Sequence, residues 1–325
     1  MVNLDSFFVL IVAFLGLMGA STWALSRWRK PDDDAAGARS PGGLGPRPRE
    51  ADRDGPREGV LQLDGEGPAR IAAFAVDAHQ GELDGIVTQR VVTLPEARCF
   101  FIAGGLTGNA LPGVAAGVVA DALRDGIEAA ARRAGGRLAP GDLREALVAA
   151  NAKLRALDAD PGEADPPGVT VVAVLAAGDR LHVAHVGADR AFRLRGDALE
   201  ALTEEHSLLG DFLRQHADFT PEKVRHVKET FPPRYRQVVV RALGMKDDVE
   251  PTLSEHAWAP GDVVALTTKG LGDVLDEATL AALLGAARAP EDIAPGLVSE
   301  AARLKPDEDH AAIVLRLDAG SPRSG

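Results

Sequence analysis

The run VTVVAVLAAGDRLHVAHVGADRAFRLR, at residues 169–195, decides the fold of this chain. It contains three strand-like segments separated by two glycine-containing turns, with the strands at 169–175, 181–186 and 190–195. Short turns between apolar runs of this length are typical of neighbouring antiparallel strands. We therefore expect an antiparallel meander of three strands in the middle of the fold.

The rest of the ordered sequence mixes helical and strand patterns. Apolar residues recur every three to four positions in segments that predict helices at 113–133, 142–157, 277–287 and 291–304. Short apolar runs predict further strands at 71–76, 99–103, 237–242, 263–268 and 311–317. The strands cluster around pairs of helices and do not alternate with them strictly. This order predicts an α+β fold, in which packed sheets form the core and helices lie outside them.

Composition and charge exclude several classes of protein. The 325-residue chain is 46% apolar, which is typical of a globular domain. Its formal net charge of −12 would repel a phosphate backbone, so we expect no nucleic-acid partner. The single cysteine, Cys99, excludes a disulfide within the chain, and no cysteine and histidine spacing indicates a zinc finger.

The N-terminal segment has the properties of a membrane anchor. Residues 7–25 contain no charged side chain, and as a helix they would span about 28 Å, close to the thickness of a hydrocarbon core. Arg27, Arg29 and Lys30 follow directly, which predicts that the C-terminal side lies in the cytoplasm. A cleaved signal peptide, the alternative, would have a basic stretch before a shorter apolar core. We therefore expect a single-pass protein of the cell membrane.

The chain divides into four parts by composition. Residues 1–30 form the transmembrane anchor with its basic flank, and residues 31–69, rich in Pro, Gly and charged residues, form a disordered tether. Residues 70–318 form the globular domain, and residues 319–325 form a disordered tail.

Seven strings in the globular part occur in a characteristic order. They are FIAGGLTGN at 101–109, GVT at 168–170, VGADR at 186–190, LTEEHS at 202–207, RALG at 241–244, LTTKGL at 266–271 and the pair Asp309-His310. This set resembles the motifs of the type 2C (PPM-type) metal-dependent Ser/Thr protein phosphatases. The resemblance covers about residues 70–318 and implies a four-layer α-β-β-α sandwich behind the N-terminal helix.

The same resemblance implies a centre of two Mg²⁺ or Mn²⁺ ions, held by carboxylates, that activates a water molecule. In this chain three of the corresponding ligand positions are substituted, by Gly104, Ala188 and Lys269. Only Asp309 stands where the resemblance places a ligand. We therefore expect no metal cofactor, and Mn²⁺ or Mg²⁺ only if the protein is active.

Other carboxylates could replace the missing ligands. Asp77 and Asp84 lie in the region where the family's early Arg-x-x-Asn-Glu-Asp element belongs, and Asp189 is one residue from Ala188. A lysine ammonium repels a divalent ion at short range, so we also consider a Lys269–Asp309 ion pair in place of a metal bridge.

The resemblance and the local chemistry suggest one further type of contact. Arg190, Gly105 and Gly108 are candidates for binding a phosphate or another anion, because arginine and glycine-rich turns bind such groups.

Three functions follow from these observations, and the least favoured is a sensor that binds a nucleotide or small anion in the vacated site. The first is a membrane-anchored, catalytically degenerate phosphatase-like module in signal transduction, which binds a protein partner, such as a phosphorylated protein. The alternative is an active Mn²⁺- or Mg²⁺-dependent Ser/Thr protein phosphatase with displaced ligands. The loss of ligand positions favours the first, because a fold without its chemistry serves other roles.

Overall fold

A computed structural model describes residues 59–63, 69–78, 88–107, 111–157, 167–232, 235, 238–286, 289–306 and 308–319. For residues 59–78 and 318–319 the description covers only the course of the backbone. All described residues belong to the compact unit Gly55–Gly325.

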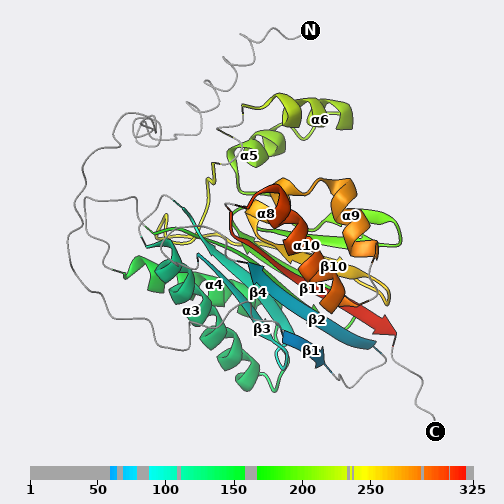
Figure 1. Ribbon diagram of the computed structural model, residues 1–325. Helices are drawn as coiled ribbons and strands as arrows, with labels where there is room; N and C mark the ends of the chain where they lie inside the picture. The colour runs from blue at the N-terminus through cyan, green and yellow to red at the C-terminus, as the bar shows by residue number, and fades with distance from the viewer. Residues whose placement is uncertain are drawn as a thin grey trace. The chain divides into compact units, whose positions relative to one another are not determined.

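Two antiparallel sheets form the centre of this unit (Figure 1). The six-stranded sheet has the order β1 (Gly59–Leu63), β2 (Ala69–Ala78), β11 (His310–Ala319), β10 (Val263–Thr267), β7 (Arg190–Arg195) and β8 (Ala198–Ala201). The five-stranded sheet has the order β3 (Gln89–Leu94), β4 (Cys99–Gly105), β5 (Val169–Ala177), β6 (Arg180–Val186) and β9 (Thr252–Ala257).

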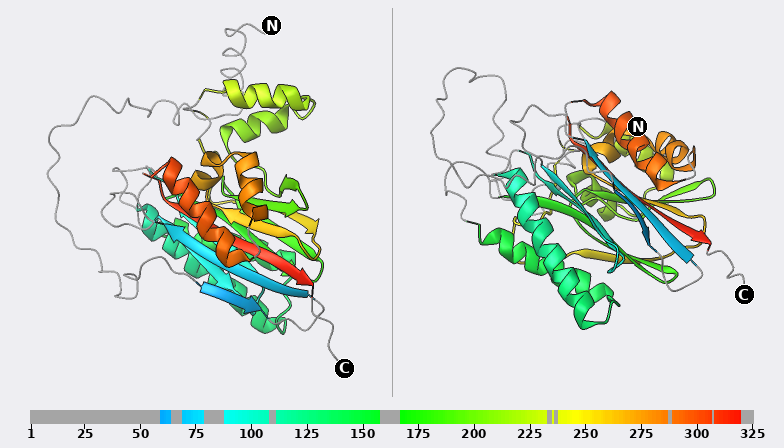
Figure 2. Two further views of the ribbon diagram at one scale, coloured as in Figure 1. Left: turned by 45° about the vertical axis from the view of Figure 1, so that its right-hand side comes forward. Right: turned by 60° about the horizontal axis from the view of Figure 1, so that its bottom comes forward.

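Helices cover the outer face of each sheet (Figure 2). The five-stranded sheet packs on α3 (Pro112–Arg133) and α4 (Pro140–Arg155), and the six-stranded sheet packs on α8 (Lys269–Val274), α9 (Glu277–Ala286) and α10 (Pro290–Leu304). A third apolar cluster lies between the two sheets. The expected α-β-β-α layers are therefore present. Two further helices, α5 (Leu208–Gln215) and α6 (Pro221–Thr230), lie beyond one end of the sandwich.

Strand β5 shows why its sequence is apolar at nearly every position. Val171, Ala173 and Leu175 pack toward α3 and α4, and their neighbours Val172 and Val174 pack into the layer between the sheets. Successive side chains of a strand point to opposite faces. A strand between a helix layer and a second sheet therefore buries both faces and shows no alternation.

The predicted meander of three strands is wrong at its second turn. Strand β6 pairs with β5 and β9, whereas β7 belongs to the other sheet, where it pairs with β10 and β8. The segment between them therefore crosses from one sheet to the other. Gly187 makes this possible, because its φ is 111° and an added Cβ would lie 2.3 Å from Cγ2 of Thr170.

Several element boundaries also differ from the predictions. The predicted strand at 237–242 is not formed in the described residues, where Val239 makes a single bridge to Ser207. The sequence patterns did not predict two helices, α5 and α6, or three strands, β3, β8 and β9. Strand β1 lies inside the stretch predicted as a tether, so the folded domain begins before residue 70. Its five residues pair with β2, which outweighs the polar sequence around them.

The predicted anchor at 7–25 lies outside the described residues, and so do residues 31–58 of the tether and 320–325 of the tail. Within the described part of the chain, every helix is too short or too polar to cross a bilayer.

Candidate functional site

The substituted ligand positions come together at one end of the sandwich. The ladders place Gly104 between Gln89 and Thr170, and they place Thr267 between Arg190 and Ala312. Ala188 lies in the segment after β6, Lys269 begins α8 just after β10, and Asp309 directly precedes β11. Hydrogen bonds join Lys269 to Asp189 and Asp309 to Gln89. The sequence-based prediction that these positions share one site is consistent with this arrangement.

Asp189 is the most buried carboxylate of the site, with 3% of its surface exposed. Its Oδ1 accepts a hydrogen bond from the backbone N–H of Lys269 at 3.0 Å, and its Oδ2 accepts one from the Thr170 hydroxyl at 2.7 Å. Burial raises the pKa of this carboxyl group to about 6, against the opposing effect of the two hydrogen bonds. Both oxygens are thus already engaged within the protein.

Asp189 also faces the position where the resemblance places an aspartate. A Cβ added to Gly104 would lie 3.6 Å from Oδ2 and 3.9 Å from Oδ1 of Asp189. Ala188, the other substituted position, is fully buried. The acidic group of the crossover therefore lies beside the position where a side chain at 104 would begin.

The hypothesis of a Lys269–Asp309 ion pair is wrong. The Lys269 ammonium pairs with Asp273, one turn later in α8. The Asp309 carboxylate accepts a hydrogen bond from the Thr88 hydroxyl at 2.7 Å, and its backbone carbonyl accepts one from Nε2 of Gln89 at 2.8 Å. Residues at i and i+4 of a helix lie side by side, which explains why Lys269 selects Asp273.

Arg190 is held by the same network. It donates to the backbone carbonyl of Gly272 at 2.8 Å and to Asp273 at 2.7 Å, and it forms an ion pair with Glu205. Asp273 therefore bridges two cations, Lys269 and Arg190. With these partners the Arg190 guanidinium is not available as a phosphate contact unless an ion pair opens.

The two glycines proposed to bind an anion are Gly105 and Gly108. A Cβ on Gly105 would lie 2.1 Å from the backbone oxygen of Pro112, so glycine is needed there for the close approach of α3. Gly108 lies outside the described residues. The described part of the chain therefore gives the glycine-rich turn a packing role.

Thr88 and Gln89 belong to the site and were missed by the sequence-based reasoning. They stand at the start of β3, and Gln89 is paired with Gly104 in the ladder. Gln89 is 9% exposed, and its Oε1 is buried without a hydrogen-bond partner. The proline turn at 95–98 between two apolar runs was a signal of this hairpin, and its register would have placed Gln89 opposite Gly104.

The described residues do not fit a centre of two divalent ions. No group of three or more His, Cys, Asp or Glu side chains is placed to hold a metal ion in the part of the chain that the structure describes. The carboxylates of Asp189 and Asp309 are engaged by hydroxyl and amide donors, and the positive charge of Lys269 acts on Asp189. The backbone of Asp77 pairs with Ala311, near Asp309, but its side chain and all of Asp84 lie outside the described residues.

A buried histidine pair lies beneath the crossover between the sheets. The rings of His185 and His206 stack with their centroids 4.5 Å apart. The backbone N–H of Gly187 donates to Nδ1 of His206 at 3.1 Å, and Nε2 of His206 lies 3.0 Å from the Thr252 hydroxyl. Burial, and then nearby positive charge, lowers the pKa of His206 to about 3, so this histidine is neutral.

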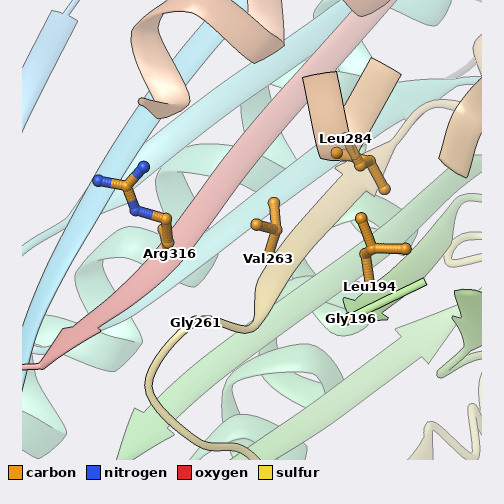
Figure 3. A pocket seen from close by; sticks show the side chains of 7 residues that line it. Leu194, Gly196, Gly261, Val263, Leu284 and Arg316 are labelled. Carbon is orange, nitrogen blue, oxygen red and sulfur yellow. The ribbon is translucent and has the colours of Figure 1, made fainter. Parts of the chain in front are cut away.

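A pocket of about 330 Å³ lies away from this site (Figure 3). Its lining consists of Leu194, Gly196, Gly261, Val263, Leu284, Gly285 and Arg316. Val263 begins β10, whereas Lys269 follows the end of that strand, so the pocket and the site lie at opposite ends of the sheet. The residues that line the pocket are therefore not part of the site.

The chain is similar in sequence to bacterial Ser/Thr protein phosphatases. The Ser/Thr protein phosphatase PstP of Mycobacterium tuberculosis is 30% identical over 228 residues, which are 70% of this chain and 38% of PstP. The Ser/Thr phosphatase stp of Listeria innocua is 28% identical over 134 residues, which are 41% of this chain and 50% of that protein. The chain thus spans half or less of the length of these relatives. No model of a protein family matches the chain.

Solved structures show the same fold. The crystal structure of M. tuberculosis PstP/Ppp has a TM-score of 0.62 at 26% identity and covers 77% of this chain and 99% of its own. PppA of Pseudomonas aeruginosa has a TM-score of 0.61 at 23% identity, covering 77% and 98%. A structure of the PstP catalytic domain, with a TM-score of 0.60 at 24% identity, contains two manganese ions and covers 77% and 98%.

Proposed function

Because the chain belongs to the type 2C (PPM-type) Ser/Thr protein phosphatase family, we propose that it is a catalytically degenerate member of that family. Its role is then regulatory, or it binds a phosphorylated protein partner. The proposal concerns this chain alone, because its relatives are named as phosphatases.

One observation carries the proposal, namely that the site is closed by the chain's own hydrogen bonds and ion pairs. The Asp309 carboxylate is bound by Thr88, the Asp189 carboxylate is bound by Thr170 and Lys269, and the Lys269 ammonium pairs with Asp273. A divalent ion would have to break these contacts and approach a lysine. Hard divalent ions need several free oxygen ligands, which the described residues do not offer.

Phosphatase activity with and without metal tests this proposal. Full-length protein in detergent is assayed with an aryl phosphate and a phosphoserine peptide, with millimolar Mn²⁺ or with a chelator. We expect no turnover in either condition and an unchanged melting temperature on addition of Mn²⁺. Mn²⁺-dependent turnover that the Asp309→Ala variant lacks would refute degeneracy.

We also propose that the protein is anchored in the cell membrane by residues 7–25, with the domain in the cytoplasm. The uncharged run and the basic residues after it support this topology. Membrane fractionation with alkaline washing tests the anchor, and protease protection in spheroplasts tests the side. A domain that is cleaved from outside intact cells would contradict the assignment.

The alternative, an active enzyme with displaced ligands, rests on one specific observation. The backbone of Asp77 lies beside the start of β11, close to Asp309, and Asp189 lies beside Gly104. Asp77→Asn is therefore the informative variant for any activity that appears with Mn²⁺. Loss of that activity in Asp77→Asn and in Asp309→Asn, but not in Asp125→Asn on the surface of α3, would favour this alternative.

A further inference from the structure

The acidic side chain of the crossover lies against the position where a side chain at 104 would begin. Gly104 is buried in β4, and the space beyond its Cα contains the Thr170 hydroxyl at 3.2 Å and both carboxylate oxygens of Asp189 within 4 Å of an added Cβ. An aspartate at 104 would place a second carboxylate against the first. Two ionised carboxylates at such distances cannot both be accommodated without a large cost.

We propose that Asp189 is a positioning residue that fixes the backbone of Lys269 at the site, and that its carboxylate, in contact with the position of a side chain at 104, disfavours a second carboxylate there. The inference rests on the proposed degenerate function and deepens it, because it names the group that keeps the altered site closed. Aspartate at 104 and aspartate at 189 are then alternatives.

Two contacts connect Asp189 to the rest of the site. Through Thr170 it binds the start of β5, and through the N–H of Lys269 it binds the start of α8. With its backbone fixed there, Lys269 lies within reach of Asp273, which also binds Arg190. The buried carboxylate therefore holds the first residue of α8, from which this ion-pair network begins.

A double-mutant cycle tests whether carboxylates at positions 104 and 189 destabilise each other. Melting temperatures are measured by near-ultraviolet circular dichroism on the full chain in detergent for wild type, Gly104→Asp, Asp189→Ser and the double variant. We expect Gly104→Asp to lower the melting temperature by about 6 °C in the wild-type background and by less than about 2 °C in the Asp189→Ser background. An equal loss in both backgrounds would overturn the proposal.

Two controls separate charge from bulk and from distance. Gly104→Ala adds only the Cβ, so we expect a loss well below that of Gly104→Asp, and an equal loss would mean that packing against Thr170 explains the effect. Asp273→Ser removes a nearby carboxylate that does not lie within 4 Å of the added Cβ. It should leave the cost of Gly104→Asp unchanged, and a rescue as large as that of Asp189→Ser would count against a specific pair.

A local measurement tests the positioning of Lys269 even if the aspartate variants at 104 do not fold. Amide hydrogen exchange of Lys269 is compared with that of Ala265 in β10. We expect Asp189→Ser to speed exchange at Lys269 about tenfold or more relative to Ala265, because the half-buried N–H loses its acceptor. Asp189→Asn keeps an acceptor oxygen and should restore protection to within about threefold. No acceleration in Asp189→Ser would overturn the proposal.

The same samples separate this inference from the proposed function. A Mn²⁺-induced rise in the wild-type melting temperature would contradict degeneracy whatever the cycle shows. Additive behaviour without any Mn²⁺ effect would overturn only the pairing of positions 104 and 189.

Discussion

Replacing Asp189 by asparagine should make the protein more stable at neutral pH, by an amount that depends on pH. The carboxyl group titrates near 3.8 in an unfolded chain and at about 6 in the fold, because burial disfavours its charged form. A difference of about 2.2 pKa units corresponds to about 3 kcal/mol at 1.36 kcal/mol per unit. Above pH 6 the folded protein carries this full cost.

The sign of the pH dependence follows from proton binding. Between pH 3.8 and about 6 the folded state binds more protons at Asp189 than the unfolded state does, so stability decreases as the pH rises through this range. Asparagine removes the charge but keeps an oxygen for the Lys269 N–H. Its amide can donate to Thr170, whose hydroxyl also lies 3.3 Å from the Gly104 carbonyl oxygen.

Urea denaturation of Asp189→Asn and its parent, from pH 4 to pH 8, measures this effect. The fluorescence of Trp258, which is 2% exposed, reports unfolding in a background of Trp23→Phe and Trp28→Phe. We expect the variant to gain up to about 3 kcal/mol at pH 8 and almost nothing near pH 4. A gain that does not change with pH, or a loss at pH 8, would refute the reasoning.

Three further predictions concern other parts of the fold. The fold lowers the pKa of His206 to about 3, so the wild-type protein should lose stability as the pH falls below about 6.5, and His206→Gln should lose less. Equal acid sensitivity of the two proteins in urea titrations would contradict this. Gly105→Ala should lower the free energy of unfolding by about 2 kcal/mol or more, because its Cβ would lie 2.1 Å from the Pro112 oxygen. Gly141→Ala, with open space around it, should cost nothing, and equal melting temperatures of the two variants would contradict this. Asn151→Ala should lower the free energy of unfolding by about 3 kcal/mol in denaturant titrations. Buried Asn151 donates to the carbonyls of Lys246 and Asp247 and accepts from the N–H of Gly244. A loss under about 1 kcal/mol would mean that water replaces these bonds.

The long helices and the central strands could be predicted because their patterns are unambiguous. The predicted helix at 113–133 and the observed α3 differ by one residue, and the predicted strand at 311–317 lies within β11. The sheet to which β7 belongs could not be predicted. Ala191 packs between the sheets and Phe192 packs under the outer helices, so β7 buries both faces at these two positions. Periodicity does not distinguish such strands.

The members of the site were predictable, but most of their partners were not. The family resemblance identified Gly104, Lys269 and Asp309, and the structure brings all three to one end of the sandwich. The resemblance did not indicate that Thr88 binds Asp309, because β3 was not predicted and hydroxyl partners leave no sequence pattern. The Lys269–Asp273 pair was visible as an i, i+4 spacing, but the resemblance directed attention to Asp309.

The opposition between Gly104 and Asp189 has a consequence for the history of the sequence. A carboxylate at 189 would be costly while another stood at 104, because the two side chains would be in contact. Once Asp189 and its bonds to Thr170 and Lys269 were established, a return mutation at 104 alone would have been deleterious. Aspartate at 189 therefore disfavours a return to aspartate at 104. Homologous sequences should carry aspartate at one of these two positions and seldom at both.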